Sequence, residues 1–217
     1  MDLSLQQDFC ASTPLEKTKL ELIEKKKVSA FCSKLQFLSG PSFFISERYF
    51  NFLNEDDLFI GSVFSGARLE ELMHSAYCYV VEHFAMNYLN RAEQCRKGLT
   101  VKLYKKGFKK EIIEQVLDVL EEERFLDDSR FAQAWIQNRM IRHTEGKIKL
   151  FAELCSRGIN KNVAQKAIDN YFENIDENII FEKALCKCKN LGYDDVKIVK
   201  KLMNLGFDYK IIKNTIK

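Results

Sequence analysis

Two adjacent carboxylates, Asp127 and Asp128, come closest in this sequence to a catalytic or metal-binding pair. Paired carboxylates can act in acid–base chemistry or bind Mg²⁺. A structural role is favoured here, because Phe125 and Leu126 precede the pair as core candidates and a helical pattern follows it. One of the two aspartates is then expected to cap that helix, and the other to interact favourably with its dipole.

The histidines and cysteines do not group as metal ligands or redox pairs. His74, His83 and His143 are dispersed, and neither an H-E-x-x-H motif nor a C-x-x-C motif occurs. The seven cysteines are odd in number, and Cys186 and Cys188 would point apart on a helix. No phosphate-binding glycine loop or G-x-S-x-G motif is present. We therefore expect reduced thiols, no metal, no cofactor and no enzymatic activity.

Composition indicates a helical protein with a substantial core. Hydrophobic residues make up 46% of the 217 residues, and only 2 prolines and 9 glycines interrupt them. The absence of an apolar run of 18 residues predicts no membrane span, and the N-terminus lacks the pattern of a secretory signal. A cytoplasmic, membrane-free protein is expected.

Charge is distributed unevenly along the chain. Residues 1–90 contain 8 Lys or Arg and 12 Asp or Glu, a balance of −4, whereas residues 91–217 contain 26 and 19, a balance of +7. The second half is therefore the candidate for contact with a polyanion.

Basic residues gather in three places within that half, and each cluster falls in a helical pattern. The members are Lys102, Lys105 and Lys106; Arg139, Arg142, Lys147, Lys149 and Arg157, preceded by Arg130; and Lys197, Lys200 and Lys201. Repeated basic helix faces are typical of a protein that binds a polyanion or a nucleoprotein filament. An ordinary solvated helix surface would show similar charges, so both readings stay open at this point.

Three segments align without gaps around a glycine, which indicates an internal repeat. Gly107, Gly158 and Gly206 lie 51 and 48 residues apart. Apolar residues recur eight and four positions before each glycine, and again one, five, six and ten positions after it. The pattern predicts an amphipathic helix that ends at the glycine in the left-handed conformation, followed by an apolar residue that packs back.

A second helix is expected a few residues after each glycine, with Asn160 and Asp208 as N-caps. A further helix precedes each unit, over about 70–90, 129–142 and 178–190. In the second of these, Phe131 and Trp135 lie four residues apart on one face. Three repeats of three helices give about nine helices, and we expect an extended, curved array in which neighbours stack.

The segment from about 15 to 65 has a different pattern. Polar and apolar residues alternate after Thr18 and after Lys27, Phe43 opens an aromatic-rich run, and Gly40 supplies a turn. Alternation of this kind predicts short antiparallel strands. The expected division is a small β-rich element at 1–68, followed by helical repeats at 69–125, 126–175 and 176–217, the last abbreviated.

The helical part resembles the bacterial RecX family of recombination regulators. The resemblance is carried by the acidic helix Glu114–Glu123, by the motif L-D-D-S-R-F-A at Leu126–Ala132, and by the Arg-x-x-Arg…Gly-Lys-Ile…R-G-I stretch at Arg139–Ile159. It covers about 75–217, roughly two-thirds of the chain. The motif's Leu126, Asp127, Asp128, Arg130 and Phe131, with the three repeat glycines, are identified as its structural residues.

This resemblance implies a tandem array of three-helix repeats that is not an enzyme. It implies binding along the RecA–single-stranded DNA filament, contacting DNA directly or through RecA, and inhibition of the ATPase and strand-exchange activities. Such a protein regulates homologous recombination and DNA repair within the SOS response, and we expect a monomer. The three basic clusters are the expected contact residues.

The sequence also departs from the family pattern. The third repeat lacks the L-D-D-S-R-F-A motif, and Leu205 replaces the basic residue before its glycine. Thr144 and Glu145 stand where members of the family often have a glycine-proline-like approach to the helix. An alternative function is general nucleic-acid binding by a helical array without preference for RecA, which would show steeply salt-dependent binding to bare DNA.

Overall fold

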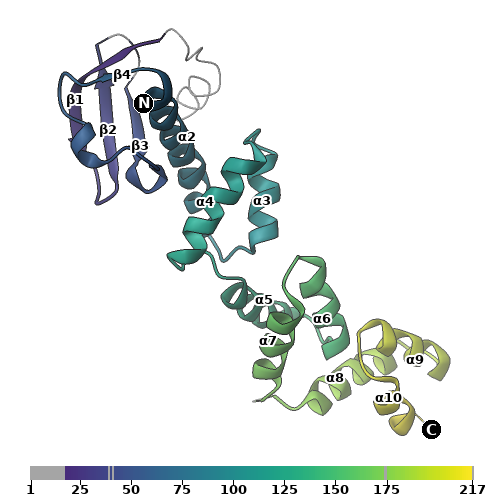
Figure 1. Ribbon diagram of the computed structural model, residues 1–217. Helices are drawn as coiled ribbons and strands as arrows, with labels where there is room; N and C mark the ends of the chain where they lie inside the picture. The colour runs from purple at the N-terminus through teal and green to yellow at the C-terminus, as the bar shows by residue number, and fades with distance from the viewer. Residues whose placement is uncertain (1–17, 39, 41, 174, 217) are drawn as a thin grey trace. The chain divides into compact units, whose positions relative to one another are not determined.

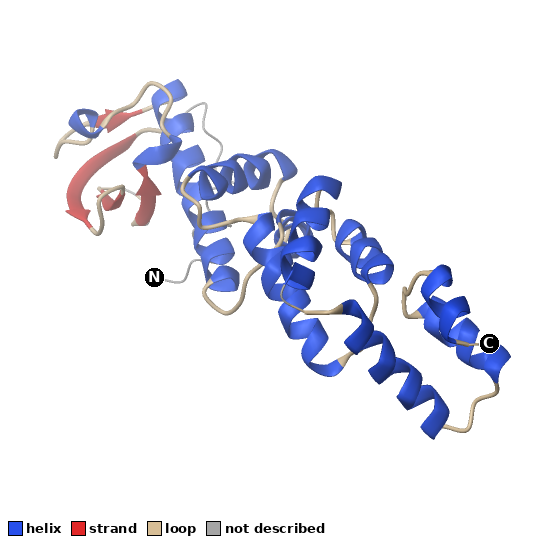
Figure 2. Cartoon of the chain, turned by 90° about the horizontal axis from the view of Figure 1, so that it is seen from below, coloured by secondary structure: helices blue, strands red, loops and turns tan. Residues whose placement is uncertain are grey.

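A computed structural model describes residues 18–38, 40, 42–173 and 175–216 of the chain (Figure 1). The described residues form four strands and nine α-helices, and Figure 2 shows the strands confined to the N-terminal part. The chain divides into two compact units, Met1–Asn90 with Thr100–Glu122, and Arg91–Leu99 with Glu123–Lys217. Both the expected β-rich N-terminal element and the helical remainder are confirmed.

The strands form one antiparallel sheet in the order β3-β2-β1-β4. Their bounds are β1 (Leu20–Lys27), β2 (Cys32–Phe37), β3 (Phe43–Ser46) and β4 (Val63–Phe64). Alternation of apolar and polar residues had predicted these strands, although residues 28–31 form the turn between β1 and β2 rather than strand. Asn54 begins a short 3-10 helix, Glu55–Asp57, through a capping box with Asp57.

One face of the sheet packs against α2 (Gly66–Leu89), the long helix beside the strands in Figure 1. The shared core includes Leu22, Phe37 and Ile45 from the sheet and Leu69 and Leu72 from the helix, all nearly inaccessible to water. Burial of this apolar surface stabilises the packing of the helix on the sheet.

The remaining helices follow the predicted repeat. They are α3 (Arg96–Tyr104), α4 (Lys110–Glu122), α5 (Asp128–Arg142), α6 (Lys147–Ser156), α7 (Lys161–Glu173), α8 (Glu177–Asn190), α9 (Asp195–Asn204) and α10 (Tyr209–Thr215). Each repeat thus has three helices, beginning with α2, α5 and α8. The residue boundaries expected for the repeats stay predictions, and so does the curved array. The compact units do not follow these boundaries at α3, because the start of this helix belongs to the second unit and its end to the first.

The three repeat glycines end α3, α6 and α9 as predicted. Their φ angles are 89°, 90° and 83° at Gly107, Gly158 and Gly206, in the left-handed region that costs glycine little. The next residue in each repeat is buried: Phe108 lies against the rings of Tyr77 and Phe84. In the other two repeats Ile159 and Phe207 are buried in the same way.

The N-caps that open the third helices are also confirmed. Asn160 accepts a hydrogen bond from the backbone N–H of Asn162 at 2.9 Å, and Asp208 accepts one from Lys210 at 2.7 Å. These bonds satisfy amides that have no partner inside the helix.

Within the second unit, the start of α6 meets the end of α9. The Gly146 N–H donates to the Leu205 carbonyl at 2.8 Å, and the Ile148 N–H donates to the Gly206 carbonyl at 3.2 Å. A β-carbon on Gly146 would come within 2.6 Å of the Gly206 carbonyl carbon. A β-carbon on Gly206 would come within 2.9 Å of the Lys149 α-carbon. The two backbones approach this closely because neither glycine has a side chain.

A matching contact joins the start of α3 to the end of α6. Cys95 Sγ donates to the Arg157 carbonyl at 3.4 Å, and Lys97 Nζ donates to the Ser156 carbonyl at 3.1 Å. A β-carbon on Gly158 would lie 2.6 Å from Lys97 Cδ. Cys95 and Gly146 each stand twelve residues before their own repeat's glycine, so the two contacts use equivalent positions. We call each of them a glycine joint.

We predict that Gly206→Ala destabilises the protein much more than Gly107→Ala. Both glycines have similar positive φ angles, so each alanine costs about 1–2 kcal/mol of unfolding free energy from the backbone alone. Gly107 faces open space among the described residues, whereas alanine at 206 also overlaps the backbone at Lys149. Urea unfolding followed by circular dichroism measures the difference. Equal losses for the two variants would show that the glycine joint contributes no stability.

Candidate functional site

The Asp127–Asp128 pair binds backbone amides at two helix starts. Asp127 is the N-cap of α5 and accepts hydrogen bonds from Ser129 N–H at 2.7 Å and Arg130 N–H at 3.1 Å. Asp128 accepts one from the Arg96 N–H, at the start of α3, at 2.9 Å. Each carboxylate therefore satisfies donors that a helix leaves unpaired, in agreement with the structural role favoured from the sequence.

The residues before this pair divide between core and surface. Leu126 is buried as predicted, but Phe125 is 44% exposed, so its prediction as a core residue is wrong. The chain turns at Arg124, which has a left-handed φ of 61°. After this turn only Leu126 points into the core.

Arg130 of the L-D-D-S-R-F-A motif is held by groups of the protein itself. Its guanidinium pairs with the Glu93 carboxylate and donates to the carbonyls of Arg124 at 3.1 Å and Phe125 at 2.8 Å. The side chain thus fixes the turn between α4 and α5. Phe131, the next residue, lies partly buried against the core of the second unit.

The basic cluster of the second repeat is organised around a buried carboxylate, Glu145. Only 1% of this residue is exposed. Arg139 donates to both carboxylate oxygens, from Nε at 2.8 Å and from Nη2 at 2.9 Å, and Lys149 Nζ lies 2.7 Å from Oε1. Burial alone would raise the pKa of Glu145, but the hydrogen bonds from Arg139 and Lys149 outweigh it and lower the pKa to about 2.

Two further members of this cluster have carboxylate partners. Arg157 pairs with Glu153 at 2.6 Å and lies over the Trp135 ring, and Lys147 pairs with Glu177 at 3.3 Å. Arg142 alone makes no ion pair with another described residue. Three carboxylates therefore offset three of the five positive charges, which leaves the cluster a net charge of +2.

Lysines of the other two clusters lie mostly on exposed helix surface. Lys102 and Lys106 sit over the rings of Tyr88 and Phe84, at 5.0 and 5.4 Å from the ring centres. Lys105 is exposed and has no carboxylate partner among the described residues. Lys105 and Lys106 are thus exposed just after the end of α3, whereas Lys102 is half-buried.

In the third repeat, Lys197 lies 4.1 Å from the centre of the Tyr193 ring. Lys200 and Lys201 are exposed on α9, and neither forms an ion pair within the part of the chain that the structure describes. Lys102 and Lys201 each stand five residues before their repeat's glycine, so the two clusters occupy related places on the middle helix.

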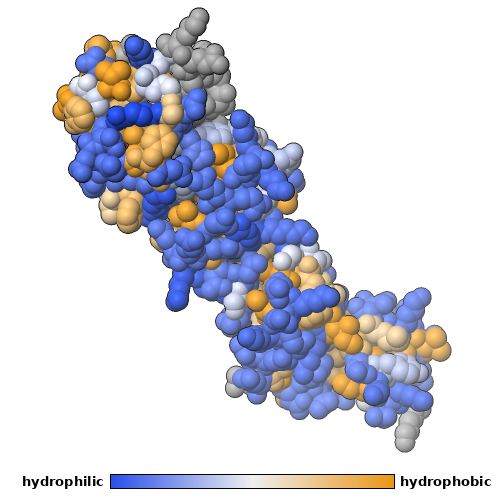
Figure 3. All heavy atoms as spheres, in the orientation of Figure 1, coloured by the Kyte–Doolittle hydropathy of each residue, from blue (hydrophilic) through white to orange (hydrophobic). Residues whose placement is uncertain are grey.

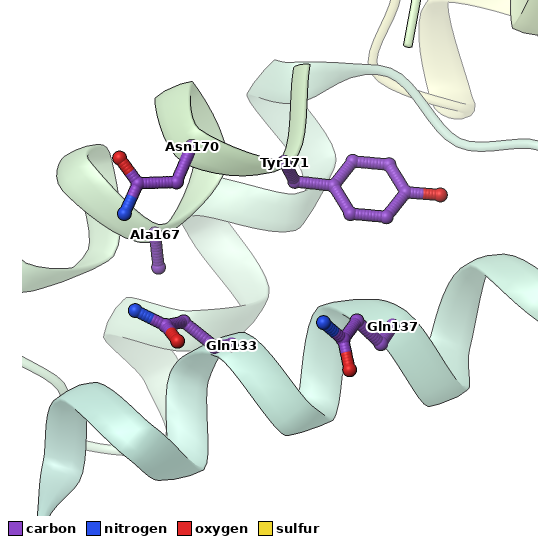
Figure 4. A pocket seen from close by; sticks show the side chains of 5 residues that line it. All are labelled: Gln133, Gln137, Ala167, Asn170 and Tyr171. Atoms are coloured by element: carbon purple, nitrogen blue, oxygen red, sulfur yellow. The ribbon is translucent and has the colours of Figure 1, made fainter. Parts of the chain in front are cut away.

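A hollow between α5 and α7 has no charged side chain in its lining (Figure 4). Gln133 and Gln137 project from α5 toward Ala167, Asn170 and Tyr171 of α7. The lining supplies amide and phenol groups and no positive charge, so this hollow is distinct from the basic clusters.

The described part of the chain contains no group of three or more His, Cys, Asp or Glu residues suited to a metal ion. Six cysteines are free thiols there, while Cys10 lies outside the described residues. None of the described helices has the length and apolar character needed to cross a bilayer.

Sequence reasoning did not identify the carboxylates that hold the arginines. Glu145 precedes Lys149 by four residues, a spacing that signals an ion pair on a helix. Nothing in that spacing showed that Glu145 would be buried or would bind Arg139 as well. The partnership of Glu93 with Arg130 joins residues 37 positions apart, and no local pattern predicts it.

Comparison with known proteins matches these repeats to two family models. The model described as RecX, first three-helix domain, matches residues 83–120, and RecX, second three-helix domain, matches residues 127–168. The regulatory protein RecX of Treponema pallidum (strain Nichols) is 33% identical over 136 residues, which cover 63% of this chain and 83% of that protein. This chain belongs to the RecX family.

Other members of the RecX family extend the comparison. The regulatory protein RecX of Clostridium acetobutylicum is 28% identical over 205 residues, covering 88% of this chain and 89% of the relative. A crystal structure of regulatory protein RecX has a TM-score of 0.72 at 14% identity and covers 91% of this chain and 98% of its own. RecX from Lactobacillus salivarius has a TM-score of 0.54 at 22% identity, covering 63% and 92%. These structures confirm the fold.

We predict that Glu145→Gln lowers stability at neutral pH and removes an acid transition. A carboxyl whose folded pKa is depressed stabilises the fold above its unfolded pKa, and the stabilisation is lost as pH falls. From the ordinary value of 4.5 to a folded value of about 2, the contribution is on the order of 3 kcal/mol. Urea unfolding at pH 7, 4 and 2.5 measures it.

Glu153→Gln is the matched control, because its pair with Arg157 is one-third exposed on each side and contributes little. If both variants show the same pH dependence as the unchanged protein, the buried pair does not account for acid sensitivity.

Replacement of Asp127 tests its capping role. We expect Asp127→Ala to cost about 1 kcal/mol of unfolding free energy, whereas Asp127→Asn costs much less because asparagine is an equally good N-cap. Thermal unfolding of the two variants measures this. An equal loss in the asparagine variant would indicate that the negative charge, rather than the hydrogen bonds, is what matters.

Proposed function

We propose that this RecX-family protein binds the RecA–single-stranded DNA filament and inhibits its ATPase and strand-exchange activities. It would act in the cytoplasm, as a monomer and without catalysis of its own, to regulate homologous recombination and DNA repair. The proposal is supported by the family membership and by what the resemblance to RecX implies.

The observation that favours a filament partner is the recurrence of basic residues at equivalent repeat positions. The position five residues before the glycine is Lys102 in the first repeat and Lys201 in the third, with Glu153 in the second. The position nine before it is Lys149 in the second repeat and Lys197 in the third, with Gly98 in the first. A protein filament has a surface that repeats at regular intervals along its length. A repeat protein with charges at matching positions is suited to such a partner.

The twelve basic residues expected at the interface differ in whether contacts within the protein already engage them. Arg130, Arg139, Lys149 and Arg157 are engaged in contacts that hold the fold, so their replacement would confuse binding with stability. The better candidates are exposed and make neither an ion pair nor a ring contact with another described residue, which sets Lys106 and Lys197 aside. These are Lys105, Arg142, Lys200 and Lys201.

General nucleic-acid binding is the second candidate function, and the same exposed lysines support it. A protein that neutralises phosphates loses affinity steeply as salt rises. Affinity for bare single-stranded DNA and for the RecA filament, measured at one salt concentration, separates the two candidates. Tighter binding to the filament supports the first.

We predict that the protein slows RecA ATP hydrolysis on single-stranded DNA at ratios below one per RecA. The double variant Lys105→Glu, Lys200→Glu should need a severalfold higher concentration for the same inhibition, because two exposed attractive charges become repulsive. Lys166→Glu on α7 is the control, since this lysine is exposed but lies outside the three clusters.

A failure of the unchanged protein to slow hydrolysis at equimolar ratio would refute the proposed function. If instead the double variant and Lys166→Glu inhibit equally, the filament is bound through a different surface.

A further inference from the structure

A small hollow of about 200 Å³ lies beside one glycine joint, where α5, α8 and α9 come together in the second unit. Its rim and floor differ in character. Arg142, His143, Lys187 and Lys201 supply polar groups, and Ala184, Cys188, Leu191 and Leu205 supply an apolar surface. In Figure 3, hydrophobic surface lies among hydrophilic surface over the region of α8 and α9.

The rim is strongly positive. Arg142, Lys187 and Lys201 are exposed, and none of them makes an ion pair with another residue in the described ranges. No carboxylate lines the hollow. Glu145, two residues after His143, is buried and already paired with Arg139 and Lys149. The hollow therefore has positive charge without a compensating internal partner.

The negative ends of helix dipoles offset only part of this positive charge. Arg142, Lys187 and Lys201 stand in the last turns of α5, α8 and α9, where a cation interacts favourably with a helix end of roughly −0.5 charge. The end of α9 is moreover satisfied by the amides of Gly146 and Ile148. Three full charges outweigh these partial ones, so the rim stays positive.

The floor is aliphatic rather than aromatic. Ala184 and Cys188 are buried at its base, and Leu191 is 65% exposed although it is a large apolar residue. No aromatic ring lines the hollow to stack on a nucleobase. Its volume is below the ~300–1,000 Å³ typical of small-molecule sites, and is better matched to a single apolar side chain.

The other glycine joint shows that this character is not general. The hollow there is lined by Ala92, Glu93, Phe131, Ala134, Trp135 and Asn138. It contains a carboxylate and two aromatic rings where the first hollow has cations and aliphatic groups. Of these six residues, only Ala92 and Glu93 stand at repeat positions equivalent to lining residues of the first hollow, His143 and Thr144. The two hollows therefore differ in place as well as in chemistry, and the cationic rim is particular to the first.

We propose that the hollow between α5, α8 and α9 docks an acidic segment of a partner protein, with one large aliphatic side chain of that segment inserted against Leu191 and Leu205. The carboxylates of the segment lie against Arg142, Lys187 and Lys201. The inference goes beyond the proposed function, since it concerns the chemistry of this hollow and holds whether or not RecA is the partner.

The probe is a short synthetic peptide with a fluorescent label, in which aspartates and glutamates flank a single leucine. Fluorescence anisotropy with the full chain measures its affinity. We expect a matched peptide with serine in place of the leucine to bind about tenfold more weakly, because burial of a leucine side chain is lost. Raising the salt concentration should weaken both peptides.

Variants locate the site. Lys187→Glu and Leu191→Ser should each weaken the leucine peptide about tenfold or more, because both residues line the hollow and both are exposed. Lys166→Glu makes the same charge change on α7 and should leave affinity unchanged. Circular dichroism of each variant confirms that it is folded.

Three outcomes would overturn the proposal. One is no binding of the leucine peptide, and another is equal affinity for the leucine and serine peptides, which indicates charge attraction alone. The third is that oligothymidine binds more tightly and with the same loss in Lys187→Glu, which would assign the hollow to nucleic acid. None of these outcomes depends on RecA, so they are distinct from failure of the ATPase test.

Discussion

The second unit depends on its two glycine joints, and at one of them two backbones come into direct contact. At one joint the amides of Gly146 and Ile148 donate to the carbonyls that end α9, so one helix start satisfies another helix end. This exchange needs a residue without a β-carbon on both sides, and Gly146 and Gly206 provide it. At the other joint Lys97 covers Gly158 with a flexible side chain, which is less demanding. A glycine that first caps its own helix thereby also fixes the neighbouring repeat.

Basic residues in this protein either pair with carboxylates inside the fold or stay exposed on the surface, and the sequence alone does not separate the two groups. Glu145 is buried beside the start of α6, and a buried carboxylate must be paired to stay ionised. Arg139 and Lys149 are therefore committed to it, although both looked like solvent-facing cations of an interface. Arg142, three residues after Arg139, is exposed and makes no ion pair with another described residue. Which cations are structural is therefore determined by the position of the buried Glu145, not by how many basic residues lie close together in the sequence.

Much of the fold could be predicted because the signals are local. Each helix end marked by a glycine, and N-caps such as Asp208, depend on residues within one or two turns. The misplaced Phe125 and the unforeseen pairing of Arg130 with Glu93 depend on a left-handed turn at Arg124 and on contacts between distant segments. Neither the left-handed turn nor the contact between distant segments produces a periodic pattern in the sequence. For the same reason the basic clusters could be found from sequence, whereas their carboxylate partners could not.

The two glycine joints indicate how a repeat protein can vary its surface without changing its fold. The contacts occupy equivalent positions, twelve residues before one glycine and at the next. Between Gly146 and Gly206 they join two backbones and leave no room for a β-carbon, whereas at the other joint the side chains of Cys95 and Lys97 make them. The side chains around them are free of that constraint. At matching repeat positions, Glu153 stands in one repeat and Lys201 in the next, and His143 stands where the next repeat has Leu191. Because the joint holds the helices in place, the side chains at its rim can differ between repeats without a change of fold.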